Sequence, residues 1–342
     1  MSLMPLKLLL VGDVMLGRLV NDALKEKPPT YPWGDTLPLF QAADARLCNL
    51  ECAISDRGRP WSATLKVFHF RTDTKNAAVL HAAHIDAVSL ANNHILDFEY
   101  EGLFDTINSL KQAGIHAVGA GTTLREASEP AIWEVQGRKL GFIACTDNEP
   151  VWAASLERPG TWYVPTQIQD ERARYLFEVV RRTKTNVTCL IVSLHWGPNW
   201  GDVPPSEHQL FAHTLIDAGA DVVFGHSSHV VRGIEVYKKR PIIYGAGNFI
   251  DDYAVDEIER NDQSAIFLLD LHETTIERLC LYPTIIDYFQ ARRATTDECR
   301  VIITRMQRLC TQLETVTNWN EQEAYLEVAI SSTPDATTPF AP

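Results

Sequence analysis

Five apolar runs in this chain each stop at a cluster of side chains that can bind a metal ion or transfer a proton. Continuous apolar runs of this length are typical of strands that are buried on both faces, in sheets covered by helices. Polar residues at the carboxyl ends of such strands lie where open α/β sheets place their active sites. The repetition therefore predicts a metal-dependent α/β enzyme. The runs and the clusters that follow them are 8–11 before Gly12-Asp13, 45–48 before Asn49-Leu50-Glu51, 87–90 before Ala91-Asn92-Asn93-His94, 190–194 before His195, and 222–224 before Gly225-His226-Ser227-Ser228-His229.

The 342 residues carry a formal net charge of −13. This charge disfavours nucleic acid and anionic membranes as partners, because both bind basic patches. An anionic small-molecule or polymer substrate stays compatible with it, since bound divalent cations reverse the local potential of a cleft. No segment reaches the roughly 18 apolar residues of a membrane-spanning helix, so we expect no membrane anchor. None of these features specifies the oligomeric state.

The cysteines predict the redox state of the protein. There are seven of them, an odd number, scattered through mostly apolar stretches, which is typical of reduced, buried thiols in a cytoplasmic protein. Cys48 and Cys52 flank Glu51 and are possible metal ligands. Their three-residue gap differs from the common two-residue zinc spacing, so packing in the core is the favoured interpretation.

Strand and helix patterns alternate from residue 6 to about residue 225, and strand patterns dominate after about residue 230. The chain therefore predicts βα units first and an antiparallel set second. An apolar stripe over 296–315 predicts one further helix. The predicted organisation is one domain over 1–290, a C-terminal helical extension over 291–330 packed on the same domain, and a disordered tail over 331–342.

Asp13 and Glu51 are the acidic candidates. Asp13 is either a metal ligand, with Arg18 nearby to hold an anionic group, or the cap of the following helix, and taken alone it favours the cap. Asn49 and Glu51 lie on the same side of an extended segment, because side chains alternate along a strand. The Glu51 carboxylate can therefore bridge two cations, although function and local structure are balanced for this cluster alone.

Asn92, Asn93 and His94 are costly to desolvate after a buried strand unless they bind something. An Asn oxygen is a hard metal ligand, and a neighbouring His can act as general acid. The alternative is a polar turn with a helix cap at Asp97. Imidazoles are favoured ligands for Zn, Mn and Fe, so the pair His226 and His229 in a Gly-Ser turn favours a metal site over structural histidines. The same holds for His195 at the end of its own strand.

In this order the clusters resemble the CapA family of bacterial capsule and poly-γ-glutamate synthesis proteins, a branch of the calcineurin-like metallophosphoesterases. The resemblance implies a four-layer α/β/β/α sandwich with a divalent two-metal centre of Mn, Zn or Fe at the strand ends. The matching stretches are Gly12-Asp13-Val14-Met15-Leu16-Gly17-Arg18, Asn49-Leu50-Glu51, Ser89-Leu90-Ala91-Asn92-Asn93-His94, His195-Trp196-Gly197, Gly225-His226-Ser227-Ser228-His229-Val230 and Gly247-Asn248-Phe249.

The resemblance also implies roles for the individual residues. Asp13 would bind one metal and Glu51 would bridge both. Asn93 and His195 would bind the second metal, and His94 would be the general acid. His226 and His229 would complete the ligand set.

Three positions depart from the phosphoesterase pattern. Met15 stands where a His ligand is expected, and Asn49-Leu50-Glu51 replaces a Gly-Asp-x-x-Asp element. Alignment on His229 puts Ser227 where the first His of the last pair belongs, so that His226 must substitute for it.

The leading functional hypothesis is a metal-dependent hydrolase that cleaves a phosphoester in capsule or poly-γ-glutamate synthesis. In a two-metal site the cations activate a water molecule and hold the oxygens of the reacting group. One alternative is an enzyme that acts on peptide or polyglutamate carbonyl groups, because fold does not settle chemistry. The other is a non-enzymatic partner of a polymer synthase.

Overall fold

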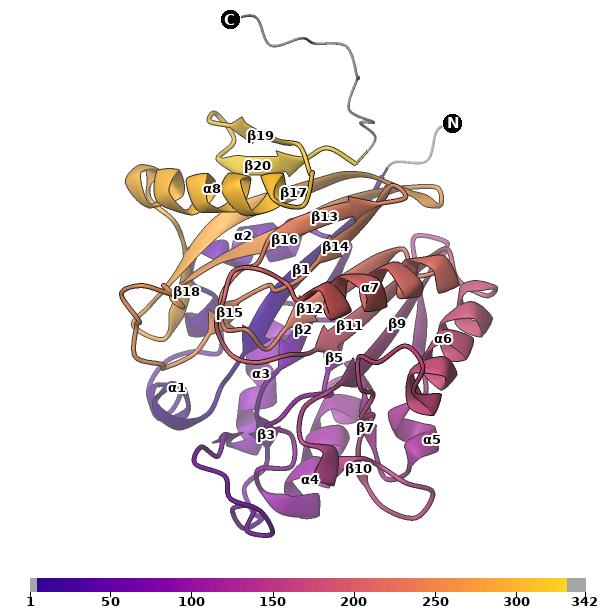
Figure 1. The fold of residues 1–342 in the computed structure, drawn as a ribbon. Helices are drawn as coiled ribbons and strands as arrows, with labels where there is room; N and C mark the ends of the chain where they lie inside the picture. Colours follow the sequence, from indigo (N-terminus) through magenta and orange to yellow (C-terminus); the bar gives the residue numbers. More distant parts are fainter. Residues whose placement is uncertain (1–4, 331–342) are drawn as a thin grey trace, which may run out of the picture.

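The computed structural model describes residues 5–330, so the tail predicted at 331–342 lies outside the described residues. Two β-sheets pack face to face, and helices cover both outer faces (Figure 1). The core has three apolar layers, one between the sheets and one between each sheet and its helices. The four-layer α/β/β/α sandwich predicted from the sequence is therefore confirmed.

The larger sheet has ten strands and runs in the order β19-β20-β17-β16-β1-β2-β5-β6, with β15 also paired to β1 and β18 to β17. Strands β1, β2, β5 and β6 are parallel, and β16 and β17 continue the sheet in antiparallel fashion, as the change in sequence pattern predicted. The strands are β1 (Leu6–Val14), β2 (Ala45–Leu50), β5 (Ala87–Ser89), β6 (His116–Val118), β15 (Asn248–Ile250), β16 (Gln263–His272), β17 (Thr275–Asp287), β18 (Gln290–Arg293), β19 (Thr317–Asn320) and β20 (Tyr325–Val328).

The smaller sheet has six strands in the order β13-β14-β12-β11-β9-β8. Its four central strands are parallel, and β8 and β13 close the two edges in antiparallel pairs. The strands are β8 (Ala131–Val135), β9 (Arg138–Thr146), β11 (Cys189–His195), β12 (Val222–His226), β13 (Ile234–Tyr237) and β14 (Arg240–Ile243). Two short pairs lie apart from both sheets, β3 (Ala53–Ile54) with β4 (Arg71–Thr72) and β7 (Ala120–Gly121) with β10 (Gly160–Thr161).

The helices divide between the two outer faces. Apolar residues of α3 and α4 pack on the larger sheet, and those of α6 and α7 pack on the smaller one. Helix α6 begins at Asp170, whose side chain accepts a hydrogen bond from the Arg172 amide, and α7 ends at Gly219 with a φ of 119°. The α-helices are α1 (Arg18–Ala23), α2 (Leu37–Ala42), α3 (Ala77–Ala82), α4 (Glu99–Gln112), α5 (Leu124–Ala127), α6 (Glu171–Lys184), α7 (Ser206–Ala218) and α8 (Thr296–Thr311).

The C-terminal segment of the described chain adds both a helix and strands to this framework. The apolar stripe of α8, including Ile302 and Met306, belongs to the layer between the two sheets. Strand β20 pairs with β17 and extends the larger sheet, which the helical prediction for 291–330 did not include. The boundary between 1–290 and 291–330 stays a prediction.

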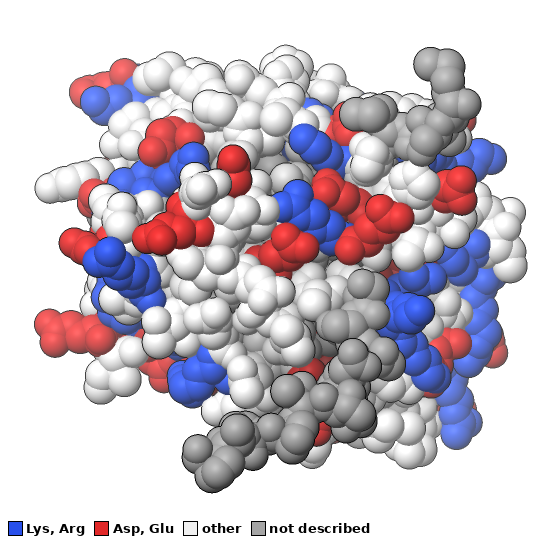
Figure 2. All heavy atoms as spheres, turned by 90° about the horizontal axis from the view of Figure 1, so that it is seen from above, with Lys and Arg blue, Asp and Glu red and all other residues white. Residues whose placement is uncertain are grey.

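The sequence also predicted the absence of membrane-spanning helices and the state of the cysteines. Within residues 5–330 no helix is long and apolar enough to cross a membrane. All seven cysteines are free and buried, as predicted. On the described part of the face that carries α8, acidic and basic side chains are interleaved (Figure 2).

Candidate metal centre and substrate pocket

The acidic part of the site lies at the carboxyl ends of β1 and β2. Asp13 belongs to β1 itself and not to a helix cap, because α1 begins only at Arg18. The register of β1 against β2 shifts between Val11 and Asp13, an irregularity that redirects a side chain. Gly12 permits this course, since a Cβ there would lie 1.9 Å from the Gly247 carbonyl oxygen. Glu51 follows β2 and is fully buried.

The histidines come from the smaller sheet. His195 and His226 are the last residues of β11 and β12, and they stand opposite each other in the strand register. Their Nδ1 atoms are 2.8 Å apart, and the His226 Nδ1 lies 3.6 Å from Asp13 Oδ1. The ring nitrogen His226 Nε2 is hydrogen-bonded to Ser193 Oγ at 2.7 Å. Ser227 turns away and donates its hydroxyl to the Gly197 carbonyl oxygen.

His229 follows on the loop after β12. Its Nδ1 donates to the Asn248 Oδ1 at 2.9 Å, since an amide oxygen can only accept. The free Nε2 is therefore the nitrogen with an available lone pair. Such a fixed tautomer is typical of an imidazole that ligates a metal.

The two sheets together form two groups of possible metal ligands. Asp13, His195 and His226 each offer an atom within 4.8 Å of the others, and so do Asp13, Glu51 and His229. Asp13 is common to both groups, whereas the sequence resemblance gives the shared position to Glu51. The roles of these residues stay predictions, but five of the six predicted ligands converge from positions far apart in the sequence.

Unpartnered oxygen atoms show that these residues fit a divalent cation. Asp13 Oδ2, both carboxylate oxygens of Glu51 and Asn93 Oδ1 are buried without a hydrogen-bond partner. An unsatisfied buried oxygen is costly, and a cation removes that cost. Asn93, the sixth predicted ligand, thus offers the atom type that the prediction requires.

Titration behaviour agrees with this interpretation. Burial, followed by the charge of Asp13, holds the pKa of Glu51 well above its usual value. Burial also lowers the pKa of His195 well below its usual value and that of His226 to about 4. Both imidazoles are therefore neutral at pH 7, the form that binds metal ions.

A chain of amides supports Asp13. The Asn92 side chain donates to Asn49 Oδ1 at 3.0 Å, and Asn49 donates in turn to Asp13 Oδ1 at 2.8 Å. Asn92 also donates to the Leu50 carbonyl oxygen at 2.8 Å. Asn92 therefore positions Asp13 through Asn49, whereas Asn93 lines the pocket.

His94 is held by the carboxylate of Asp97, which the sequence suggested only as a possible helix cap. Its Nδ1 lies 2.6 Å from Asp97 Oδ2, and its ring stacks on Phe70 with centroids 3.9 Å apart. The Nε2 faces the site, 3.8 Å from Glu51 Oε1. Burial lowers the pKa of His94 to about 4, although Asp97 opposes that shift. The signal that could have identified Asp97 is its spacing of three residues from His94.

Lys66 lies on a loop without regular structure and contacts Asp97, the partner of His94. Its ammonium lies 3.3 Å from Asp97 Oδ1 and 3.8 Å from Glu149 Oε1, and it stands 4.8 Å from the centre of the Trp152 ring. Only 8% of the Lys66 side chain is exposed. No motif in the sequence pointed to this residue.

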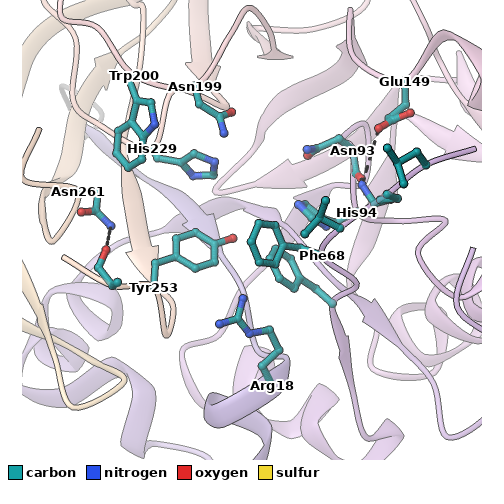
Figure 3. A pocket seen from close by; sticks show the side chains of 15 residues that line it. Arg18, Phe68, Asn93, His94, Glu149, Asn199, Trp200, His229, Tyr253 and Asn261 are labelled. Carbon is teal, nitrogen blue, oxygen red and sulfur yellow. Dashed lines mark hydrogen bonds and ion pairs between the residues drawn. The ribbon is translucent and has the colours of Figure 1, made fainter. Parts of the chain in front are cut away.

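A pocket of about 510 Å³ opens over His94 and His229. Arg18 points into it between Phe68 and Tyr253 (Figure 3). The Arg18 Nε pairs with Asp252 Oδ2 at 3.1 Å, which leaves the outer guanidinium nitrogens toward the pocket. Arg18 therefore lies where the sequence placed it, near the metal candidates and able to meet an anion.

A second acidic element that the sequence interpretation missed follows β15. Asp251 is buried, and burial followed by the charge of Asp252 raises its pKa to about 8. The adjacent Tyr253 hydroxyl is buried without a partner, and burial raises its pKa well above the usual value. The weak Gly-Asn-Phe signal at 247–249 was the only sequence feature near this segment.

Helix α8 connects the two loops on the far side of the pocket. The Arg305 guanidinium donates to the Glu259 carbonyl oxygen at 2.7 Å and to Asp202 Oδ1 at 3.0 Å. Arg308 donates to the other Asp202 oxygen at 2.6 Å. The loop with Asp202 also carries Trp200, which lines the pocket, so α8 braces part of the pocket wall.

Residues 7–253 match the family described as "Bacterial capsule synthesis protein PGA_cap". The chain belongs to this family. Membership in the PGA_cap family confirms the predicted CapA resemblance, and the sheet order agrees with the α/β sandwich that this resemblance implies. Helix α8, with Arg305 and Arg308, lies beyond the matched residues.

Two of the curated relatives have names that refer to polymer synthesis. A Mycobacterium tuberculosis protein named "Probable polyglutamine synthesis accessory protein" is 38% identical over 283 residues, covering 72% of this PGA_cap chain and 74% of that protein. The "PGA biosynthesis protein CapA" of Bacillus subtilis is 28% identical over 244 residues, covering 71% of this chain and 62% of its own length.

Solved structures show a likeness of fold. A hypothetical protein from Thermus thermophilus is 17% identical with a TM-score of 0.50, over 82% of this chain and 100% of that one. A phosphatase from Mycoplasma pneumoniae is 12% identical with a TM-score of 0.48, over 86% of this chain and 92% of that one.

Proposed function

We propose that this PGA_cap chain is a divalent-metal-dependent hydrolase that cleaves a phosphoester in the synthesis of a capsule or poly-γ-glutamate polymer. The observation that carries the proposal is the set of buried, unpartnered oxygens on Asp13 and Glu51 beside three imidazoles from the other sheet. Uncompensated carboxylates are strongly disfavoured in a protein interior, and cations are the partners that these side chains fit.

Two ions would be held by the two groups that share Asp13. His195 and His226 would complete one ligand set, and Glu51 and His229 the other, with Asn93 Oδ1 as a further oxygen ligand. When bound, the cations supply Lewis-acid stabilisation to the oxygens around a reacting phosphorus.

The chain's own residues would orient the substrate and move the proton. The Arg18 guanidinium would bind an anionic group from the open side of the pocket. Asp97 fixes the His94 ring through Nδ1, so that Nε2 is the atom that can pass a proton to a leaving oxygen. A bound anion favours the protonated ring and opposes the effect of burial on the His94 pKa.

A substrate panel tests this proposal. Phosphomonoesters, phosphodiesters and γ-glutamyl peptides are incubated with the purified protein, with and without added Mn²⁺. We expect turnover of a phosphoester that depends on Mn²⁺ and is lost in Asp13→Asn. Turnover of γ-glutamyl peptides alone would instead assign carbonyl chemistry.

A second candidate is a non-enzymatic role beside a polymer synthase. It is favoured by the name of the Mycobacterium tuberculosis relative, an accessory protein. Metal binding without turnover of any compound in the panel supports this candidate and contradicts the hydrolase proposal.

A further inference from the structure

The loop at 65–68 has the reverse of the usual surface arrangement, with its charged residue inside and its apolar residues outside. Leu65, Val67 and Phe68 are 97%, 75% and 59% exposed, whereas Lys66 is turned inward. All four line the pocket. A single exposed apolar residue is ordinary, but a group of them at one pocket marks a binding surface.

The opposite wall of the pocket is also apolar at its edge. Trp200 lines the pocket and is 38% exposed, and Val203 on the same loop is 63% exposed. The loop that provides Tyr253 and Ala254 continues to Val255, which is 52% exposed. We call Leu65, Val67, Phe68 and Trp200 the apolar rim.

The same pocket also has polar and cationic lining residues. The Arg18 guanidinium lies 5.7 Å from the centre of the Phe68 ring, so the charge and the apolar rim adjoin each other. Within residues 5–330 no hydrogen bond holds the two outer Arg18 nitrogens. Asn93, His94 and His229 line the same pocket (Figure 3).

We propose that the ligand of this pocket is an amphiphile, with an anionic phosphate-type head that meets Arg18 and an apolar chain or ring that leaves across the apolar rim. Charge complementarity places the head, because Arg18 offers a cation beside the buried His94, whereas Leu65, Val67 and Phe68 are far more exposed. The volume of about 510 Å³ exceeds what a phosphate group fills and suits a larger ligand. This inference rests on the proposed function only for the phosphate nature of the head.

Calorimetric binding of phosphonates tests the inference without requiring turnover. Methylphosphonate, octylphosphonate and phenylphosphonate are titrated into the full chain with Mn²⁺ present. Each buried methylene adds up to about fourfold in affinity, so octylphosphonate should bind at least roughly tenfold more tightly than methylphosphonate. Tight binding of phenylphosphonate without a gain for the octyl compound assigns a ring in place of a chain.

Matched variants localise the effect. The double substitution Leu65→Ser with Val67→Ser should bring the octyl-to-methyl affinity ratio close to 1, and both positions are exposed enough that folding is preserved. The control Ile132→Ser changes an apolar residue that is 44% exposed on β8, outside the pocket, and should keep the wild-type ratio.

Failure of this inference is distinct from failure of the proposed function. Equal binding of all three phosphonates overturns the amphiphile even if small phosphoesters are hydrolysed. An unchanged ratio in the double variant overturns the assignment to the apolar rim. Tight octylphosphonate binding without hydrolysis of octyl phosphate supports the amphiphile and contradicts the hydrolase.

Discussion

His94 makes its fixed contacts through Nδ1 and the ring face, so its Nε2 is available for chemistry. We expect His94→Ala to lower activity by roughly 10²–10⁴-fold, the range of general acid–base groups. Metal content should stay near the wild-type level, because His94 belongs to neither ligand group. Elemental analysis of the purified variant beside its rate checks both parts, and loss of metal would reassign His94 as a ligand.

His226 and Ser227 compete for the ligand position that departs from the phosphoesterase pattern. The His226 Nδ1 lies 3.6 Å from Asp13 Oδ1, whereas the Ser227 hydroxyl donates to a carbonyl oxygen. We therefore expect His226→Ala to lower metal occupancy and Ser227→Ala to leave it unchanged, as measured by elemental analysis. Metal retention in His226→Ala would contradict the ligand role.

The sequence predicted the site residues that lie at strand ends. It missed the residues that support the site only through contacts formed in the folded chain. Asp13, His195 and His226 follow apolar runs, so the repeated strand-end pattern together with the family resemblance predicted them as ligands, and the structure brings them together. Lys66 gave no such signal, because it reaches Asp97 from a loop whose course depends on tertiary packing. The Asn92 side chain likewise becomes a support for Asn49 only when β2 and β5 pair.

At the scale of elements, Arg305 of α8 forms hydrogen bonds to two separate loops, one containing Asp202 and the other containing Glu259. Its bonds to Glu259 and Asp202 involve a charged donor that is only 15% exposed on its side chain. We expect Arg305→Ala to raise amide hydrogen exchange in 198–203 and 254–261 by roughly tenfold, equal to about 1.4 kcal/mol. Arg300→Ala, on the same helix but 70% exposed, is the control and should leave exchange in both loops unchanged.

The start of α8 provides a prediction about acid stability. Thr295 and Glu298 form a reciprocal cap, and Arg292 binds the Glu298 carboxylate, which lowers its pKa from 4.5 to about 2. Because the folded-state pKa is the lower one, this contribution is complete above pH 4.5 and is lost as the pH falls toward 2. We expect Glu298→Gln to lower the free energy of unfolding by roughly 1 kcal/mol at pH 7. The difference from wild type should shrink below pH 4.5 in urea titrations, and a constant difference would contradict it.

The sequence predicted those strands and helices whose formation is determined by a local pattern of apolar residues. Strands β1, β2 and β11 follow from continuous apolar runs, and helix α8 follows from its apolar stripe. Strands β19 and β20 were missed, because Thr317–Asn320 has no apolar alternation and forms a strand only by pairing with its neighbour. Pairing partners across the sheet are a property of the packed chain.

For the whole molecule, the two buried acids Asp13 and Glu51 predict that a divalent cation stabilises the folded state. A cation that binds only the folded state at 100 times its Kd stabilises by about 2.7 kcal/mol, which raises Tm by about 5 °C. We expect EDTA treatment to lower the Tm by this amount and Mn²⁺ to restore it in a thermal shift measurement.

The substitution Glu51→Gln tests whether the ion that changes the Tm binds at Glu51. Since burial and Asp13 disfavour the Glu51 charge, the amide should raise the Tm of the metal-free protein. The same change should abolish the response to Mn²⁺. A variant that still gains stability from Mn²⁺ would show that the ion binds elsewhere.

The position of β1 has a consequence for the order in which a ribosome delivers this chain. Strand β1 lies between β2 and β16 and also pairs with β15, so two of its partners are synthesised more than two hundred residues after it. Until Gln263–His272 has left the exit tunnel, one edge of an apolar strand has no neighbour. Asp13 lacks its imidazole neighbours for most of the same interval. The predicted ligand groups can therefore be completed only late in biosynthesis, and until then the open edge of β1 is accessible to chaperones that bind apolar strands.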